Sequence, residues 1–191
     1  MKKLNCKQLT KKLIFFFLGL WIIQTGVAIF IGTKIGSDPF TVFTQGIANV
    51  LNITPGRANM VITFIFLFLI LLIERRYINI GTVLSMLSAG VFIDLMTNCF
   101  AGIHFENFNI IVKMLLLVLS CVIIAIGFSL LKATELGVSP NDVIPFLISD
   151  KTKGQYRVIR ICMDVTFFVV GWLLGGVIGV GTIIAALLQG P

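Results

Sequence analysis

Two acids and an amide beside prolines are the side chains of this sequence best placed to do chemistry. Asp38 precedes Pro39, whereas Asn141 and Asp142 follow Pro140. A short polar side chain at a helix start accepts hydrogen bonds from free backbone N–H groups, so these residues predict helix caps. The same positions suit contact with a solute at a gate, and both interpretations stay open. The candidate gate or solute-binding residues are Gly36, Asp38, Pro39, Gly137, Pro140, Asn141 and Asp142.

Three ionisable residues, Asp94, Arg160 and Asp164, lie deep in apolar segments. An ionisable group inside a membrane is costly unless it is paired or wet, so it is a functional hypothesis by default. Arg160 and Asp164 are four residues apart, which predicts a neutralising pair on one helix face. Asp94 has no partner in its own segment. It predicts either a residue wetted at the outer helix end, with Lys113 as a partner, or a proton or cation site.

Two basic residues, Arg57 and Arg157, stand 100 positions apart at the starts of apolar segments. A long basic side chain at a helix end reaches for lipid headgroups, so both predict anchors at the membrane surface. The alternative interpretation is capture of an anionic solute from either side.

Sequence motifs for enzyme chemistry are missing. There is no G-x-x-x-x-G-K-[ST], no H-E-x-x-H and no G-x-S-x-G motif, and His104 is the single histidine. The four cysteines show no C-x-x-C spacing. We therefore expect no enzyme activity, no metal site and no cofactor.

Composition points to the surroundings that must position these residues. Of 191 residues, 58% are hydrophobic and 12% are charged, which is typical of a chain that lies in a lipid bilayer. The formal net charge is +7, but the basic residues sit at the ends of apolar runs. They fit contact with anionic headgroups and topology signals, so the bilayer is the expected partner and nucleic acid is not.

Six apolar runs predict membrane-spanning helices, the last one short. Lysines before the first run, together with Arg75, Arg76 and Lys132, predict the cytoplasmic side, so both termini are expected in the cytoplasm. In each of two longer connections, 34–56 and 133–156, a proline predicts the start of a short amphipathic helix. The predicted spans are 13–31, 58–73, 80–98, 110–131, 158–174 and 177–191.

The sequence also repeats itself. Gly36-Ser37-Asp38-Pro39 corresponds to Gly137-Val138-Ser139-Pro140, 101 positions later, and Ile80-Gly81-Thr82 corresponds to Val180-Gly181-Thr182, 100 positions later. Each unit holds three predicted spans, and an odd number inverts the second unit relative to the first. We predict an all-α fold: one polytopic membrane domain, 1–191, with repeats 13–98 and 110–191 in inverted orientation.

At the two loops the sequence resembles the YczE/YyaS/YitT-type bacterial membrane proteins. Ile35-Gly36-Ser37-Asp38-Pro39-Phe40-Thr41-Val42 and Leu136-Gly137-Val138-Ser139-Pro140-Asn141-Asp142-Val143 are similar to that family's L-G-x-x-P-W-D-V. The first copy departs from the pattern, having Phe40-Thr41 where an aromatic residue and an aspartate are usual. The resemblance implies a polytopic inner-membrane protein without a settled biochemical role.

Inverted repeats recur in secondary transporters, whose sites lie near the repeat interface. The leading hypothesis is therefore a permease-like transporter for a small solute. The alternative is a non-transporting scaffold or accessory subunit, which predicts a tightly packed interface between the repeats. The sequence leaves the solute, the coupling ion and any homo-oligomer open.

Overall fold

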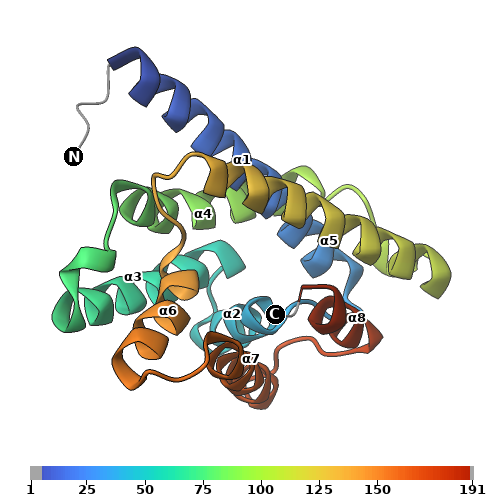
Figure 1. The fold of residues 1–191 in the computed structure, drawn as a ribbon. Coiled ribbons are helices and arrows are strands. Elements are labelled where there is room, and N and C mark those ends of the chain that lie inside the picture. Colours follow the sequence, from blue (N-terminus) through green and yellow to red (C-terminus); the bar gives the residue numbers. More distant parts are fainter. Residues whose placement is uncertain (1–5, 190–191) are drawn as a thin grey trace.

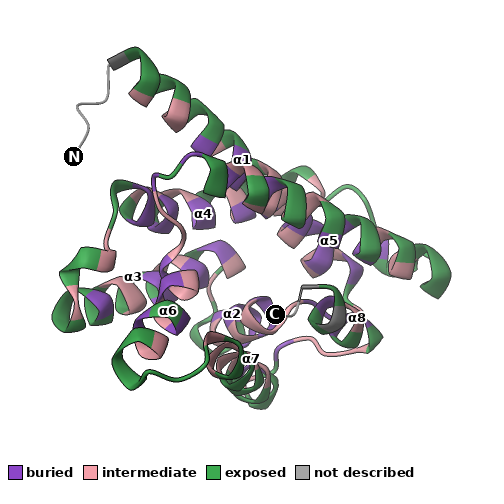
Figure 2. Ribbon diagram, in the orientation of Figure 1, coloured by how far each residue is buried: buried purple, intermediate pink, exposed green. Residues whose placement is uncertain are grey.

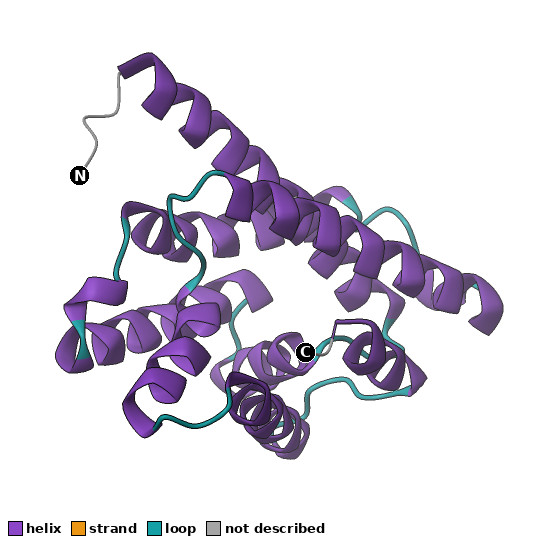
Figure 3. Cartoon of the chain, viewed as in Figure 1, coloured by secondary structure: helices purple, strands orange, loops and turns teal. Residues whose placement is uncertain are grey.

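The protein is all-α across the residues that the computed structural model describes, 6–189 (Figure 3). This part of the chain forms eight α-helices and two short 3-10 turns, η1 (Arg75–Tyr77) and η2 (Phe105–Asn107). The prediction that the fold is all-α is confirmed. The helices are α1 (Cys6–Thr33), α2 (Pro39–Leu51), α3 (Pro55–Ile73), α4 (Ile80–Cys99), α5 (Ile110–Ala133), α6 (Pro140–Thr152), α7 (Tyr156–Leu173) and α8 (Val180–Gln189).

Four helices are long and apolar enough to cross a membrane: α1, α3, α4 and α5. The prediction of six spans is thus confirmed for four of them. α7 carries three charged residues in its 18 positions, Arg157, Arg160 and Asp164. α8 has 10 described residues, and the end of the span predicted there, residues 190–191, lies outside the described part of the chain.

The two short helices predicted in the long connections are confirmed as α2 and α6. Each begins at a proline, Pro39 or Pro140, because the fixed φ of proline suits the first helical turn. Each ends after 13 residues at a residue with left-handed backbone, Asn52 or Lys153, where φ is 51° and 53°. Both helices are too short to span a bilayer, and both lie against longer helices.

α1 and α5 run alongside each other (Figure 1). Glycines allow the close approach: a Cβ at Gly19 would lie 3.0 Å from the Gly127 carbonyl oxygen, and a Cβ at Gly26 would lie 3.0 Å from that of Ser120. Gly19 and Ser120 are 101 positions apart, as are Gly26 and Gly127. If the two halves of the chain are exchanged, the contact of Gly19 with Gly127 therefore becomes the contact of Ser120 with Gly26.

The loops before α2 and α6 make a second pair of contacts that correspond in this way, which we also call exchanged contacts. Gly81 N–H, in α4, donates to the Leu136 carbonyl at 2.9 Å, and Gly181 N–H, in α8, donates to the Ile35 carbonyl at 2.9 Å. α2 packs against α7, and α3 packs against α6. The two halves of the chain are thus interleaved and do not stand apart as separate bundles.

Buried and exposed faces separate clearly along the long helices (Figure 2). Phe16, Leu20, Leu131 and Leu136 form a buried cluster between α1, α5 and the loop after α5. The outer faces of α3 and α5 instead expose large apolar side chains such as Phe64 on α3 and on α5 Ile111, Leu115 and Ile126. In a bilayer these faces contact lipid, so exposure there carries no penalty.

Candidate functional site

A cavity of about 320 Å³ lies between the two halves of the chain. Its wall includes residues from both proline motifs, Asp38 and Thr41 from the first and Asn141 and Asp142 from the second. Three of the predicted gate residues therefore meet at one place, although they lie about 100 positions apart in the sequence. The other polar residues that line it are Gln24, Thr44, Asn59, Ser139 and Arg160.

Asp38 both caps a helix and lines the cavity. Its carboxylate accepts hydrogen bonds from the backbone N–H of Thr41 at 3.1 Å and from the Thr41 hydroxyl at 2.6 Å. The predicted capping role is present at the start of α2. Burial raises the pKa of the Asp38 carboxyl above its ordinary value, and the two bonds from Thr41 oppose that rise.

Asp142 makes a different contact from Asp38, and it is a contact the sequence did not suggest. Arg160, on α7, donates to Asp142 at 3.1 Å and lies 3.4 Å from Asp164. The predicted pair of Arg160 and Asp164 is present. One guanidinium therefore lies between two carboxylates, and it lines the cavity together with Asp142.

Asp94 lies outside this cavity. Its carboxylate accepts hydrogen bonds from the Thr54 hydroxyl at 2.6 Å and from the Gly56 backbone N–H at 2.9 Å, both at the start of α3. The predicted partner Lys113 is not among these contacts. Asp94 thus caps a neighbouring helix, because free N–H groups at a helix start attract a carboxylate wherever it lies in the sequence.

The remaining predicted site residues shape or flank the cavity. Arg57 and Arg157 are exposed near the starts of α3 and α7, as expected of surface anchors, and neither lines the cavity. Gly36 is buried against the start of α8. Pro39 and Pro140 begin α2 and α6, and Gly137 packs against the start of α4.

Sequence reasoning missed Asn59, a polar residue inside the apolar run of α3. Its side chain is 8% exposed and lines the cavity, and its Oδ1 atom has no hydrogen-bond partner in the described structure. Asn59 is 101 positions before Arg160, so equivalent positions of the two halves face the same cavity. Comparing polar residues at this spacing would have found the pair.

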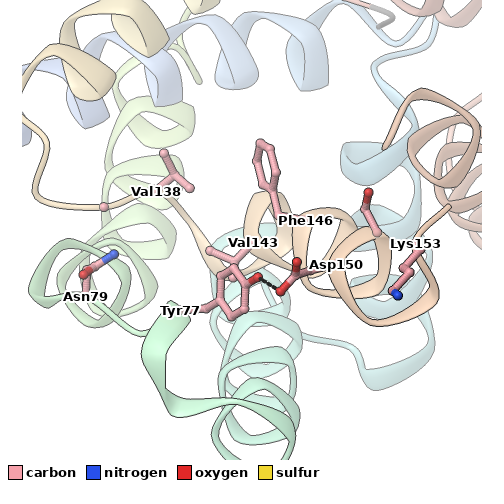
Figure 4. Close-up of a pocket in the computed structure, with 9 residues that line it drawn as sticks. Tyr77, Asn79, Val138, Val143, Phe146, Asp150 and Lys153 are labelled. Carbon is pink, nitrogen blue, oxygen red and sulfur yellow. Dashed lines mark hydrogen bonds between the residues drawn. The ribbon is translucent and has the colours of Figure 1, made fainter. Parts of the chain in front are cut away.

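A second, more open cavity of about 520 Å³ lies beside α6 (Figure 4). At its edge the Tyr77 hydroxyl donates to Asp150 at 2.6 Å, and Arg76 pairs with the same carboxylate. Lys151 lies 3.4 Å from Glu74. These exposed ion pairs join the end of α3 to α6, and we call them the α6 charge cluster. The hydrogen bond from Tyr77, followed by attraction to Arg76, lowers the pKa of Asp150, with burial opposing.

The corresponding contact between α2 and the end of α7 uses no charged side chain. Asn49 donates to the Gly175 carbonyl at 2.7 Å, and Val177 N–H donates to the Gln45 side-chain oxygen at 3.1 Å. Asn49 precedes Asp150 by 101 positions, and Glu74 precedes Gly175 by the same number. Equivalent places in the two halves are therefore joined by ion pairs in one case and by neutral hydrogen bonds in the other.

Comparison with known protein families identifies the chain. Residues 10–191 match the model of DUF6198, a family of unknown function. The chain belongs to the DUF6198 family. The matched range covers both proline motifs and every helix that lines the central cavity.

Among relatives of this DUF6198 member, the uncharacterized membrane protein YczE of Bacillus subtilis (strain 168) is 30% identical over 96% of this chain and 84% of its own. The uncharacterized protein YyaS of the same organism is 23% identical over 94% of this chain and 89% of its own. An uncharacterized protein of Haemophilus influenzae is 25% identical over 92% of this chain and 78% of its own. The resemblance stated from the motifs is confirmed, and the chain is a multi-pass membrane protein with bacterial homologues. No solved structure matches it.

Proposed function

We propose that this protein is a secondary transporter that carries a small solute across the cell membrane. The observation that carries the proposal is the central cavity, because residues of both motif copies line it. Solute sites of secondary transporters lie near the midplane, at the interface between structural repeats. A volume of about 320 Å³ falls in the range of small-molecule sites, about 300–1,000 Å³.

The proposal includes two inverted repeats of three spans each. The exchanged contacts support it, since Gly81 bonds to Leu136 as Gly181 bonds to Ile35. Such reciprocal contacts are typical of units related by a two-fold axis. α7 and α8 would be the fifth and sixth crossing segments. Pairing of Arg160 with two acids lowers the cost of placing α7 in the membrane.

Alternating exposure of the cavity then needs one gate at each end. We assign the gates to the α6 charge cluster, which joins the end of α3 to α6, and to the contact between Asn49 and Gly175, which joins α2 to the end of α7. Opening the end at the charge cluster breaks exposed ion pairs, which cost little. Opening the other end also separates the close packing of Gly46 on Gly171, so it costs more. With both termini in the cytoplasm, the charge cluster lies on the cytoplasmic side.

Inverted topology can be tested at two equivalent exposed positions, Val50 at the end of α2 and Lys151 at the end of α6. Each is replaced by cysteine in a chain lacking the four native cysteines and is labelled with a membrane-impermeant thiol reagent in intact cells. The proposal expects Val50→Cys to label from outside and Lys151→Cys to label only after permeabilisation. Labelling of both from one side refutes inversion.

Transport itself is tested by solute uptake from a labelled panel into proteoliposomes. Filling the cavity with Ala89→Phe is expected to abolish any uptake, because Ala89 is 3% exposed and lines it. Val91→Phe on the exposed side of the same helix is the matched control and keeps uptake. Absence of flux for the whole panel, with the protein shown to be folded, argues for a scaffold.

The scaffold alternative predicts a closely packed interface between the halves, and the cavity at this interface supports the carrier instead. The proposal assigns no enzymatic step to the protein. Among the described residues, no group of three His, Cys, Asp or Glu side chains is placed to hold a metal ion. The bilayer and a small solute are the partners that the proposal requires.

A further inference from the structure

The side of the central cavity formed by α1, α4 and α5 is mainly apolar, with Ile23, Ile93 and Phe128 among its side chains and Gln24 on α1 as a polar exception. The polar side comes from the starts of α2 and α6 together with Asn59 on α3 and Arg160 on α7. A ligand that fills this space must be amphipathic, with a polar group at one end and an apolar body at the other.

Three groups of the polar side offer acceptors to the cavity. The Thr41 hydroxyl donates its proton to Asp38, and the Thr44 hydroxyl donates its proton to the Phe40 carbonyl at 2.9 Å. A hydroxyl has one proton, so both offer only lone pairs to the cavity. Asn59 Oδ1, on a side chain more than nine-tenths buried, adds an acceptor without a partner. An unsatisfied buried acceptor of this kind favours a ligand that donates.

The charges of the site are also unequal. Asp38 and Asp142 line the cavity with Arg160, and Asp164 bonds to Arg160 from the same helix. The Arg160 guanidinium contacts two of these three carboxylates, and the charge of Lys132 also acts on Asp142. The three carboxylates still outnumber the two basic side chains, so the site favours a positively charged ligand and disfavours an anion.

We propose that the central cavity binds a small organic cation, with its ammonium group against Asp142 and Asn59 and its apolar body against α1 and α5. This inference rests on the proposed carrier function, for which it names the class of solute. The volume of about 320 Å³ is roughly ten times the space of one water molecule, about 30 Å³. A bare metal ion would leave the apolar side unfilled.

The test is direct binding of alkylammonium probes to the full chain purified in detergent, measured by isothermal titration calorimetry. Butylammonium is expected to bind saturably, whereas butanol and butyrate of the same length are not. Asn59→Leu keeps every charge and is expected to weaken butylammonium binding about 10- to 100-fold, the usual effect of losing a hydrogen bond to a charged group. Asp142→Asn, as a second variant, removes one charge and is expected to weaken binding at least as much.

Glu106→Gln is the matched control, because Glu106 is an exposed acid outside both the cavity and the α6 charge cluster, and it leaves binding unchanged. The inference is overturned if butyrate binds as well as butylammonium, if no ammonium probe binds the folded protein, or if neither cavity variant weakens binding. Saturable displacement by sodium ions alone, with no preference for longer alkyl chains, also overturns it in favour of an inorganic cation site.

The outcomes separate this inference from the carrier proposal. Saturable binding of butylammonium without flux in proteoliposomes keeps the cation site and refutes transport. Flux of a neutral or anionic solute, without ammonium binding, keeps transport and refutes the cation site.

Discussion

The glycine of the first proline motif offers a sharp test of the interleaved packing. Gly36 has φ of 113°, and a Cβ there would lie 2.4 Å from the Thr182 hydroxyl oxygen and 2.7 Å from the Thr182 backbone nitrogen. Gly36→Ala therefore adds backbone strain of about 1–2 kcal/mol. It also forces the start of α8 to move, at the usual overpacking cost of about 1–3 kcal/mol. The expected destabilisation is about 2–5 kcal/mol.

The equivalent change, Gly137→Ala, should cost less. Its φ is 126°, but the nearest atoms would be the Asn79 Cβ at 2.9 Å and the Thr82 hydroxyl oxygen at 3.0 Å. The backbone strain is similar and the overlap is smaller, so we expect about 1–3 kcal/mol. Gly102→Ala is the control, since nothing lies within 4 Å of its added Cβ, and its effect should stay within about 0.5 kcal/mol.

The assay is thermal unfolding of the purified protein in detergent, followed by tryptophan fluorescence. For a chain of this size 1 kcal/mol corresponds to about 2–4 °C, so Gly36→Ala should lower the unfolding temperature by about 5–20 °C. The structure requires the fall in unfolding temperature to decrease in the order Gly36→Ala, Gly137→Ala, Gly102→Ala. If Gly36→Ala unfolds at the same temperature as Gly102→Ala, the contact between the first motif and α8 is wrong.

Three further predictions concern contacts outside the central cavity. Asp94→Ala removes the carboxylate that caps α3 and should destabilise the chain by about 1–3 kcal/mol, whereas Lys113→Ala should change the same thermal measurement little. The pKa of Asp150 is lowered in the folded state, so its contribution is complete above its ordinary pKa and is lost as pH falls through the lowered value. Wild type should therefore lose stability below about pH 4 more steeply than Asp150→Asn in unfolding scans, and equal slopes would contradict the bond from Tyr77. Because its ion pairs are exposed, the α6 charge cluster should weaken as salt rises, so the unfolding temperature of the wild type should fall with salt more than that of Asp150→Asn.

Local sequence was sufficient for the helices and their starts. Proline followed by an apolar run predicted α2 and α6, because the fixed φ of proline and a preceding polar residue act within one helical turn. The pair of Arg160 and Asp164 was predictable for the same reason, since residues four apart share a helix face. The membrane-spanning helices were harder to predict. Hydropathy and length identify α1, α3, α4 and α5, but charges leave α7 outside those criteria.

Contacts between distant residues were not predictable from spacing. Asp94 looked unpaired because its partners, Thr54 and Gly56, lie about 40 positions earlier on another helix. Asn59 looked like one polar residue in an apolar run until the fold placed it on the cavity wall. A hydrogen bond between helices depends on how their axes cross, and crossing depends on side-chain packing along both helices.

By itself, then, the sequence determined that the chain is an all-α membrane protein, where most of its helices begin, and that two segments 101 positions apart share a motif. Those properties follow from hydropathy, helix length and capping, which act over a few residues. Only the tertiary structure decided that both motifs line one cavity, that Arg160 lies between two acids, and that Asp94 caps α3. These features arise because close glycine contacts between α1 and α5 and the exchanged contacts at Gly36 and Gly137 fix how the two halves pack.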